Sequence, residues 1–142
     1  MVKVELQQRL AEEYRYAANK ISESKDPNRI LYYFSIFYGE AQRILNFQWD
    51  ADLALIHMAT HYIYNNARAL IQSPNASIIP FNAKVFFDGL AQIASDIAEY
   101  FETGKDNINE LHDILGRIAK IGYTTTGNGA YLFERGIINL DE

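Results

Sequence analysis

The amino-acid sequence predicts an all-α protein, an antiparallel helical bundle of four to five helices with a short C-terminal extension. Apolar residues recur every three or four positions along most of the chain, which is the helical period. The interruptions of this period coincide with prolines, glycines and N-cap residues. The 142 residues are 49% hydrophobic and include only three prolines, so one domain spanning 1–142 with its own core is expected.

Five helical segments follow from this pattern. Leu6, Leu10 and Tyr14 recur at steps of four and predict one buried face for the first helix. Asp26 and Pro27 predict the start of the second, because Asp is a favoured N-cap and Pro fits the first helical position. The predicted helices cover about residues 3–23, 27–47, 50–72, 82–103 and 106–121, and the tail covers 123–142.

The later helices are bounded by turn-forming residues. The third is expected to begin at Asp50 and to end before residues 73–80, a segment with two prolines that predicts a loop. Gly104 and Gly122 stand where C-cap glycines are found, so we expect the fourth and fifth helices to end there.

The C-terminal tail changes character. Residues 123–126 are aromatic or β-branched, 127–129 are Gly-Asn-Gly, and 130–133 could pair back on the first group as a β-hairpin. A two-stranded hairpin is marginally stable alone, so we expect the tail to pack on the bundle or on another subunit.

The second helix is apolar over most of its circumference. Its core face carries Phe34 and Phe37, yet further apolar residues cover much of the opposite side. A helix of this kind is either central in its fold or shared between subunits. The candidate interface residues are Tyr32, Tyr33, Ile36 and Phe47. A homo-oligomer, a dimer or larger, is therefore predicted.

The third helix carries the one pair of histidines with metal-ligand spacing. His57 and His61 stand four positions apart, which places both imidazoles on one face. The residues between them lack the glutamate of an H-E-x-x-H zinc site. The pair belongs to a polar stripe that we expect to face solvent, with Leu55 in the apolar arc on the other side. A metal site is the less favoured interpretation and needs a third ligand from elsewhere.

Three ionisable residues lie in or at the edge of an apolar arc on different helices. They are Glu13, Glu40 and His112. Glu40 has Ile36 and Phe37 one turn away, so we expect it to be buried and hydrogen-bonded to a tyrosine hydroxyl, an arginine or His112. Buried ionisable groups mark functional sites more often than exposed ones, although a purely structural hydrogen bond is the simpler interpretation.

Composition excludes several classes of function. The chain has no cysteine, which removes disulfides, thiolate catalysis and cysteine-ligated metals. Its net charge of −5 disfavours nucleic acid and anionic membrane as partners. The longest apolar stretch, 30–38, is too short for a bilayer, and residues 1–10 lack the apolar core of a signal peptide, so a cytoplasmic protein is expected.

The function predicted from these features is that of a non-enzymatic, self-associating interaction or scaffold module. An excess of apolar helix surface and the scarcity of catalytic motifs both favour it. No cofactor is predicted. The alternative is a metal- or small-ligand-binding bundle, including a hydrolase, that draws on His57, His61, Glu40 and His112.

Overall fold

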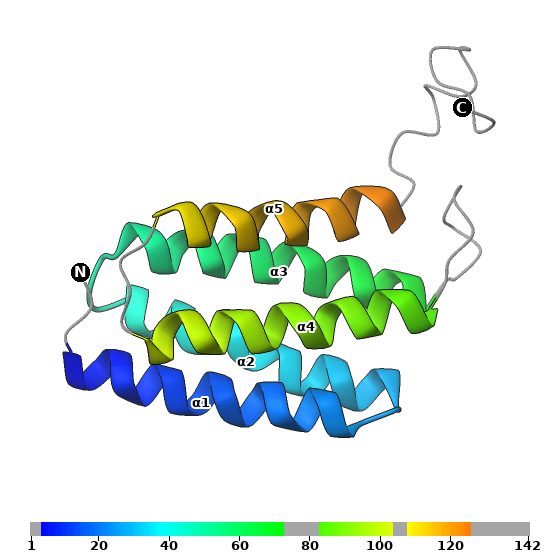
Figure 1. Ribbon diagram of the computed structural model, residues 1–142, viewed down its shortest axis with the longest axis horizontal. Helices are drawn as coiled ribbons and strands as arrows, with labels where there is room; N and C mark the ends of the chain where they lie inside the picture. The colour runs from blue at the N-terminus through cyan, green and yellow to red at the C-terminus, as the bar shows by residue number, and fades with distance from the viewer. Residues whose placement is uncertain (1–3, 73–82, 104–107, 126–142) are drawn as a thin grey trace, which may run out of the picture.

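The computed structural model describes residues 4–72, 83–103 and 108–125, and these residues form five helices (Figure 1). The predicted all-α class is confirmed. Helix α2 ends two residues earlier than predicted, at Leu45, and α5 ends four residues later than predicted, at Thr125. The helices are α1 (Val4–Glu23), α2 (Pro27–Leu45), α3 (Ala51–Gln72), α4 (Ala83–Glu102) and α5 (Ile108–Thr125).

The helices close into a ring in the order α1, α2, α3, α5, α4, and α2 also touches α4 across the interior. Helices that follow one another in the chain run in opposite directions (Figure 1). Because a ring of five cannot alternate throughout, one pair of neighbours, α3 and α5, runs parallel. None of the described helices has the length and apolar character that crossing a membrane requires.

Tyr14 joins three of the helices at the centre of the core. Its ring stacks on Phe37 of α2 at 4.8 Å and meets Phe101 of α4 edge-on at 5.3 Å. Its hydroxyl donates a hydrogen bond of 2.8 Å to the Phe37 carbonyl oxygen. Burial, and secondarily the charge of Glu40, raise the pKa of Tyr14 well above its usual range. The side chain is therefore a neutral hydrogen-bond donor inside the bundle.

Two aspartates cap the helices of the α2–α3 pair. The Asp26 side chain accepts a hydrogen bond of 3.0 Å from the Asn28 backbone N–H, so the predicted start of α2 is confirmed. The Asp50 side chain accepts one of 2.9 Å from the Leu53 N–H at the start of α3. Each cap satisfies a backbone donor that has no partner within its own helix.

Arginines hold α4 to the helices on either side. Arg15 of α1 donates two hydrogen bonds to the Glu102 carboxylate, at 2.7 and 3.0 Å. This pairing raises the pKa of Arg15 and lowers that of Glu102. Arg117 of α5 forms an ion pair with Asp96 of α4. Polar side chains of α4 are therefore used in contacts with α1 and α5.

The prediction that Gly122 ends the last helix is wrong. Helix α5 continues to Thr125, and Gly122 is buried inside it. A Cβ atom at this position would lie 3.0 Å from Cε1 of Tyr62, so the missing side chain lets α5 approach α3 closely. The first predicted hairpin strand is also wrong, because 123–125 are helical. Gly104 and residues 126–142 lie outside the described part of the chain.

Candidate functional site

The interface residues predicted on α2 divide into two groups. Tyr32 is 70% exposed, and Phe47, which lies just beyond the end of α2, is 92% exposed. Tyr33 and Ile36 are half-buried and pack against the core. Only the first two therefore offer most of their surface to a partner, and Arg43 lies between them in the chain, also exposed.

Tyr32 belongs to a row of tyrosines across α1 and α2. Its ring lies 5.1 Å from that of Tyr33, which lies 6.1 Å from Tyr16 of α1, both edge to face. The Lys20 ammonium sits 5.8 Å from the centre of the Tyr16 ring. This row combines aromatic rings with a cation, and both kinds of side chain are common at protein–protein contacts.

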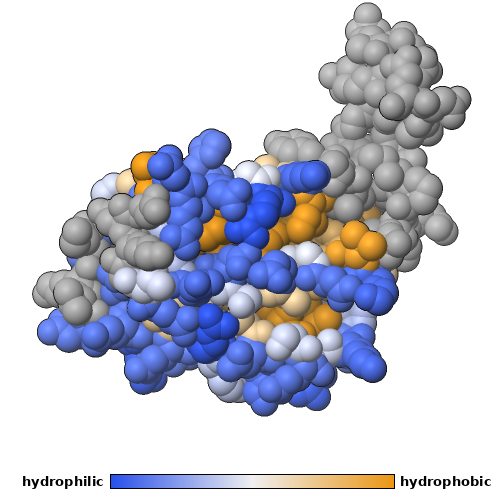
Figure 2. Space-filling model, in the orientation of Figure 1, coloured by the Kyte–Doolittle hydropathy of each residue, from blue (hydrophilic) through white to orange (hydrophobic). Residues whose placement is uncertain are grey.

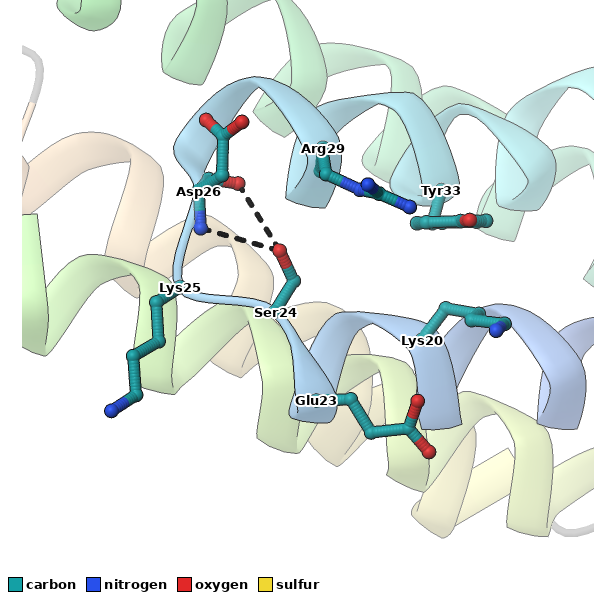
Figure 3. A pocket seen from close by; sticks show the side chains of 7 residues that line it. All are labelled: Lys20, Glu23, Ser24, Lys25, Asp26, Arg29 and Tyr33. Atoms are coloured by element: carbon teal, nitrogen blue, oxygen red, sulfur yellow. Dashed lines mark hydrogen bonds between the residues drawn. The ribbon is translucent and has the colours of Figure 1, made fainter.

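The row borders a shallow groove of about 330 Å³ at the α1–α2 turn (Figure 3). Arg29 extends towards Tyr33, whereas Lys25 points away from the other lining residues. The Ser24 hydroxyl is occupied by the backbone of Asp26. Charges of both signs line the groove and do not converge on one point, so its geometry favours no particular ligand. The lining residues are Lys20, Glu23, Ser24, Lys25, Asp26, Arg29 and Tyr33.

The outward side of α3 carries an uncharged, largely exposed strip. Asp52 and Arg68 are the only residues of the helix that are charged at neutral pH, and neither belongs to the strip. Met58 is 67% exposed and Leu55 is 42% exposed. We call this strip the α3 outer surface, and it consists of Ala51, Leu55, Met58, His61, Asn65 and Ala69.

The exposure of Leu55 contradicts the prediction that it lies in the core. Thr60, in contrast, lies on the face of α3 that is buried in the bundle. Its hydroxyl donates a hydrogen bond of 2.6 Å to the Ile56 carbonyl oxygen. A hydroxyl satisfied within its own helix can be buried at little cost. The scarcity of charge along α3 was the signal in the sequence that could have revealed this surface.

Further exposed aromatic residues lie in the connection between α2 and α3, at one end of the bundle. Phe47 and Trp49 lie in the connection that leads into α3, and both are largely exposed. In contrast, hydrophilic side chains cover most of the face formed by α1, α4 and α5 (Figure 2). The α3 outer surface differs from that face, because its six residues are uncharged and include the exposed Leu55 and Met58.

The two histidines lie at the boundary between α3 and α2. Their ring centres are 5.8 Å apart, and the Tyr38 ring of α2 lies 4.8 Å from His61 and 6.5 Å from His57. His57 is half-buried, and desolvation, followed by the charge of His61, lowers its pKa. Within 4–72, 83–103 and 108–125, no third acidic or histidine ligand completes a metal site with this pair.

The three ionisable residues predicted in the interior are not buried. His112 is exposed on α5, so its interior position was wrong. Glu13 is half-exposed and pairs with Arg9 at 3.3 Å. Glu40 is also half-exposed, which corrects the expected burial, although its charge is close enough to Tyr14 of α1 to raise the pKa of that side chain. The structure does not bring these three residues together into a site.

Charge is distributed unevenly along the bundle axis. We divided each helix at its midpoint and assigned 24–26 and 46–50 to the halves that they border. The described residues of the two halves then carry formal charges of +5 and −9. The basic half contains the α1–α2 turn. It carries Arg15, Lys20, Lys25, Arg29, Arg68, Lys84, Arg117 and Lys120 against Glu23, Asp26 and Asp88. The acidic half carries Arg9 and Arg43 against Glu5, Glu12, Glu13, Glu40, Asp50, Asp52, Asp96, Glu99, Glu102, Glu110 and Asp113.

The fold and its surfaces can be compared with known proteins. No protein family, curated protein or solved structure matches this chain. A helical bundle supports many unrelated functions, so the function must be argued from the surfaces described above.

Proposed function

We propose that the protein is a self-associating interaction module without a catalytic role, and that the α3 outer surface docks on a second copy. The observation that carries this proposal is the exposure of Leu55 and Met58 on a helix face without charge. Charged residues are depleted in the centres of protein interfaces, and methionine and aromatic residues are enriched there. The exposed Phe47 and Trp49 beside α3 have the same character.

The size of the surface supports the proposal. Phe47, Trp49, Leu55 and Met58 together expose roughly 600 Å² of side chain, judged from their exposed fractions. Full coverage of these four residues on two copies would supply about the ~1,000 Å² that a specific interface needs. A helix face of this kind left in water is also unusual in a monomer.

Binding of a metal or small ligand is the competing proposal. The observation in its favour is the closeness of the His57 and His61 rings, which a small rotation could direct at one ion. Two ligands alone bind weakly, because water must supply the other positions. Metal analysis of the purified protein, compared with the His57→Ala/His61→Ala variant, decides between the two proposals. One equivalent of divalent metal that is lost in the variant would favour metal binding.

Sedimentation velocity at micromolar concentration tests the proposed self-association. We expect the wild-type protein to sediment as a dimer or larger species and Met58→Glu as a monomer, because the new carboxylate would be desolvated in the interface. Val85→Glu is the matched control, since Val85 is 65% exposed on α4, away from this surface. A monomeric wild type, or a Met58→Glu variant as associated as the control, would overturn the proposal.

A further inference from the structure

We infer that two copies pair antiparallel, α3 against α3, around a twofold axis close to His61. This inference rests on the proposed self-association and adds the geometry of the partner. Two observations carry it independently. One is the order of large and small residues along the α3 outer surface, and the other is the division of charge along the bundle.

Large and small residues occupy opposite halves of the α3 outer surface. Leu55 and Met58 stand in the first half of the helix, and Asn65 and Ala69 stand in the second half. Along the helix, Met58 and Asn65 lie at equal distances from the point midway between positions 61 and 62. Leu55 and Ala69 lie at nearly equal distances from the same point. An antiparallel partner therefore places Met58 opposite Asn65 and Leu55 opposite Ala69, so that a large side chain meets a smaller one in both pairs, which favours close helix packing.

A parallel pair would place each residue opposite its own copy. Leu55 and Met58 would then meet their counterparts and hold the helices apart, while a gap would remain between the two copies of Ala69. Such a gap forfeits packing contacts and is unfavourable. The side-chain sizes thus distinguish the two orientations without reference to charge.

The charge distribution favours the same orientation. In an antiparallel pair, the half with charge −9 lies beside the partner's half with charge +5, and this occurs twice. A parallel pair would bring like halves together, including the two acidic ones. Asp52 and Arg68 are the charges on α3 itself, whereas the charges of α1 and α4 lie across the bundle and act on the partner at longer range. All of them lie outside the uncharged α3 outer surface and remain hydrated. Charges in such positions steer association and select orientation.

Disulfide trapping tests the orientation, because the natural chain has no cysteine and any engineered thiol is the only one. Met58→Cys and Asn65→Cys proteins are mixed, equilibrated in a glutathione redox buffer and analysed by non-reducing electrophoresis and mass spectrometry. An antiparallel pair should form mainly the mixed 58–65 disulfide, since these Cα atoms come within bonding range. His61→Cys, close to the axis, should form a disulfide with its own copy and serves as the positive control.

Ionic strength provides the second arm of the test. We expect the dissociation constant of the wild-type dimer to rise several-fold between about 0.02 and 0.5 M salt, because screening weakens the attraction between opposite halves. A disulfide between two copies of Met58→Cys, together with a dissociation constant that falls as salt is added, would overturn the antiparallel geometry. The proposed self-association would still hold in that case. A dimer that yields none of these disulfides would exclude α3 as its interface. A monomer at all salt concentrations would overturn the proposed function itself.

Discussion

Tyr14 shows how one residue can link several helices. Its ring contacts α2 and α4 while its own backbone belongs to α1, and its hydroxyl donates to the Phe37 carbonyl oxygen. The apolar part fills the core and the hydroxyl still finds a partner, which is the usual condition for burying a tyrosine. The free energy of unfolding of the bundle therefore depends on the protonation state of the Tyr14 hydroxyl.

We expect Tyr14→Phe to lower the free energy of unfolding by about 1 kcal/mol at pH 7, through loss of the buried hydrogen bond. The folded-state pKa of Tyr14 is raised, so the stability linked to its proton is present below the unfolded pKa of about 10 and is lost as pH rises above it. Urea unfolding at pH 7 and pH 11 should show the difference between the two proteins shrinking and then reversing. A constant difference would show that Tyr14 does not titrate on unfolding.

Asn66 of α3 offers a second test at the residue scale. Its Nδ2 atom is buried and has no hydrogen-bond partner in the part of the chain that the structure describes. We expect Asn66→Leu, which keeps the shape and removes the amide, to raise the free energy of unfolding by about 1 kcal/mol. Asn19→Leu on the exposed side of α1 is the control and should change stability by less than ~0.5 kcal/mol. Destabilisation by the Asn66 change would reveal a partner for the amide.

At the scale of the elements, α5 depends on how closely it approaches its neighbours. Gly122 faces the Tyr62 ring of α3, whereas a Cβ atom at Gly116 would meet nothing within 4 Å. Gly89 of α4 faces the end of the flexible Ile121 side chain of α5, at 2.7 Å from its Cδ1. The glycines of α4 and α5 thus have different physical roles. Gly122 and Gly89 allow close packing, whereas Gly116 does not serve it.

Thermal unfolding of two alanine variants separates these roles. Gly116→Ala should stabilise the protein by about 0.5–1 kcal/mol, because alanine loses less conformational entropy in a helix. Gly122→Ala has the same intrinsic gain, but its methyl group would lie 3.0 Å from Tyr62, so we expect no gain or a net loss. Equal stabilisation by both variants would mean that the Tyr62 ring can move away from position 122 without cost.

At the scale of the whole molecule, the packing of the five helices leaves the uncharged α3 outer surface uncovered. The ring uses the polar face of α4 for ion pairs with α1 and α5, whereas α3 keeps its outer surface free of charge. A bundle with this arrangement can bury its own core and still present an apolar face to a second copy.

Self-association should be visible in the thermal midpoint. If dimers form through the α3 outer surface, we expect the midpoint of the wild-type protein to rise by a few degrees per tenfold increase in protein concentration. The midpoint of Met58→Glu should not depend on concentration, and its far-ultraviolet circular dichroism should match the wild type, because Met58 is exposed. Calorimetry over a hundredfold concentration range measures both. A concentration-independent wild type would contradict the proposal.

The amino-acid sequence was sufficient to predict the helical class and the helix boundaries to within a few residues. It also determined local features such as the Asp26 cap, because periodicity, capping and proline act over a single turn. Of the four predicted interface residues, Tyr32 and Phe47 are largely exposed, and their part in an interface stays a prediction.

Tertiary structure alone decided which side of each helix is enclosed. Leu55 is exposed and Thr60 is buried because the positions of α2 and α5 select the covered arc of α3. Gly122 continues α5 rather than ending it, and the Tyr62 ring of α3 packs where its side chain would be. For the same reason Glu40 and His112 are not enclosed, although apolar residues surround them in the sequence. A helical wheel records the directions of side chains, but burial depends on the neighbours that packing places there.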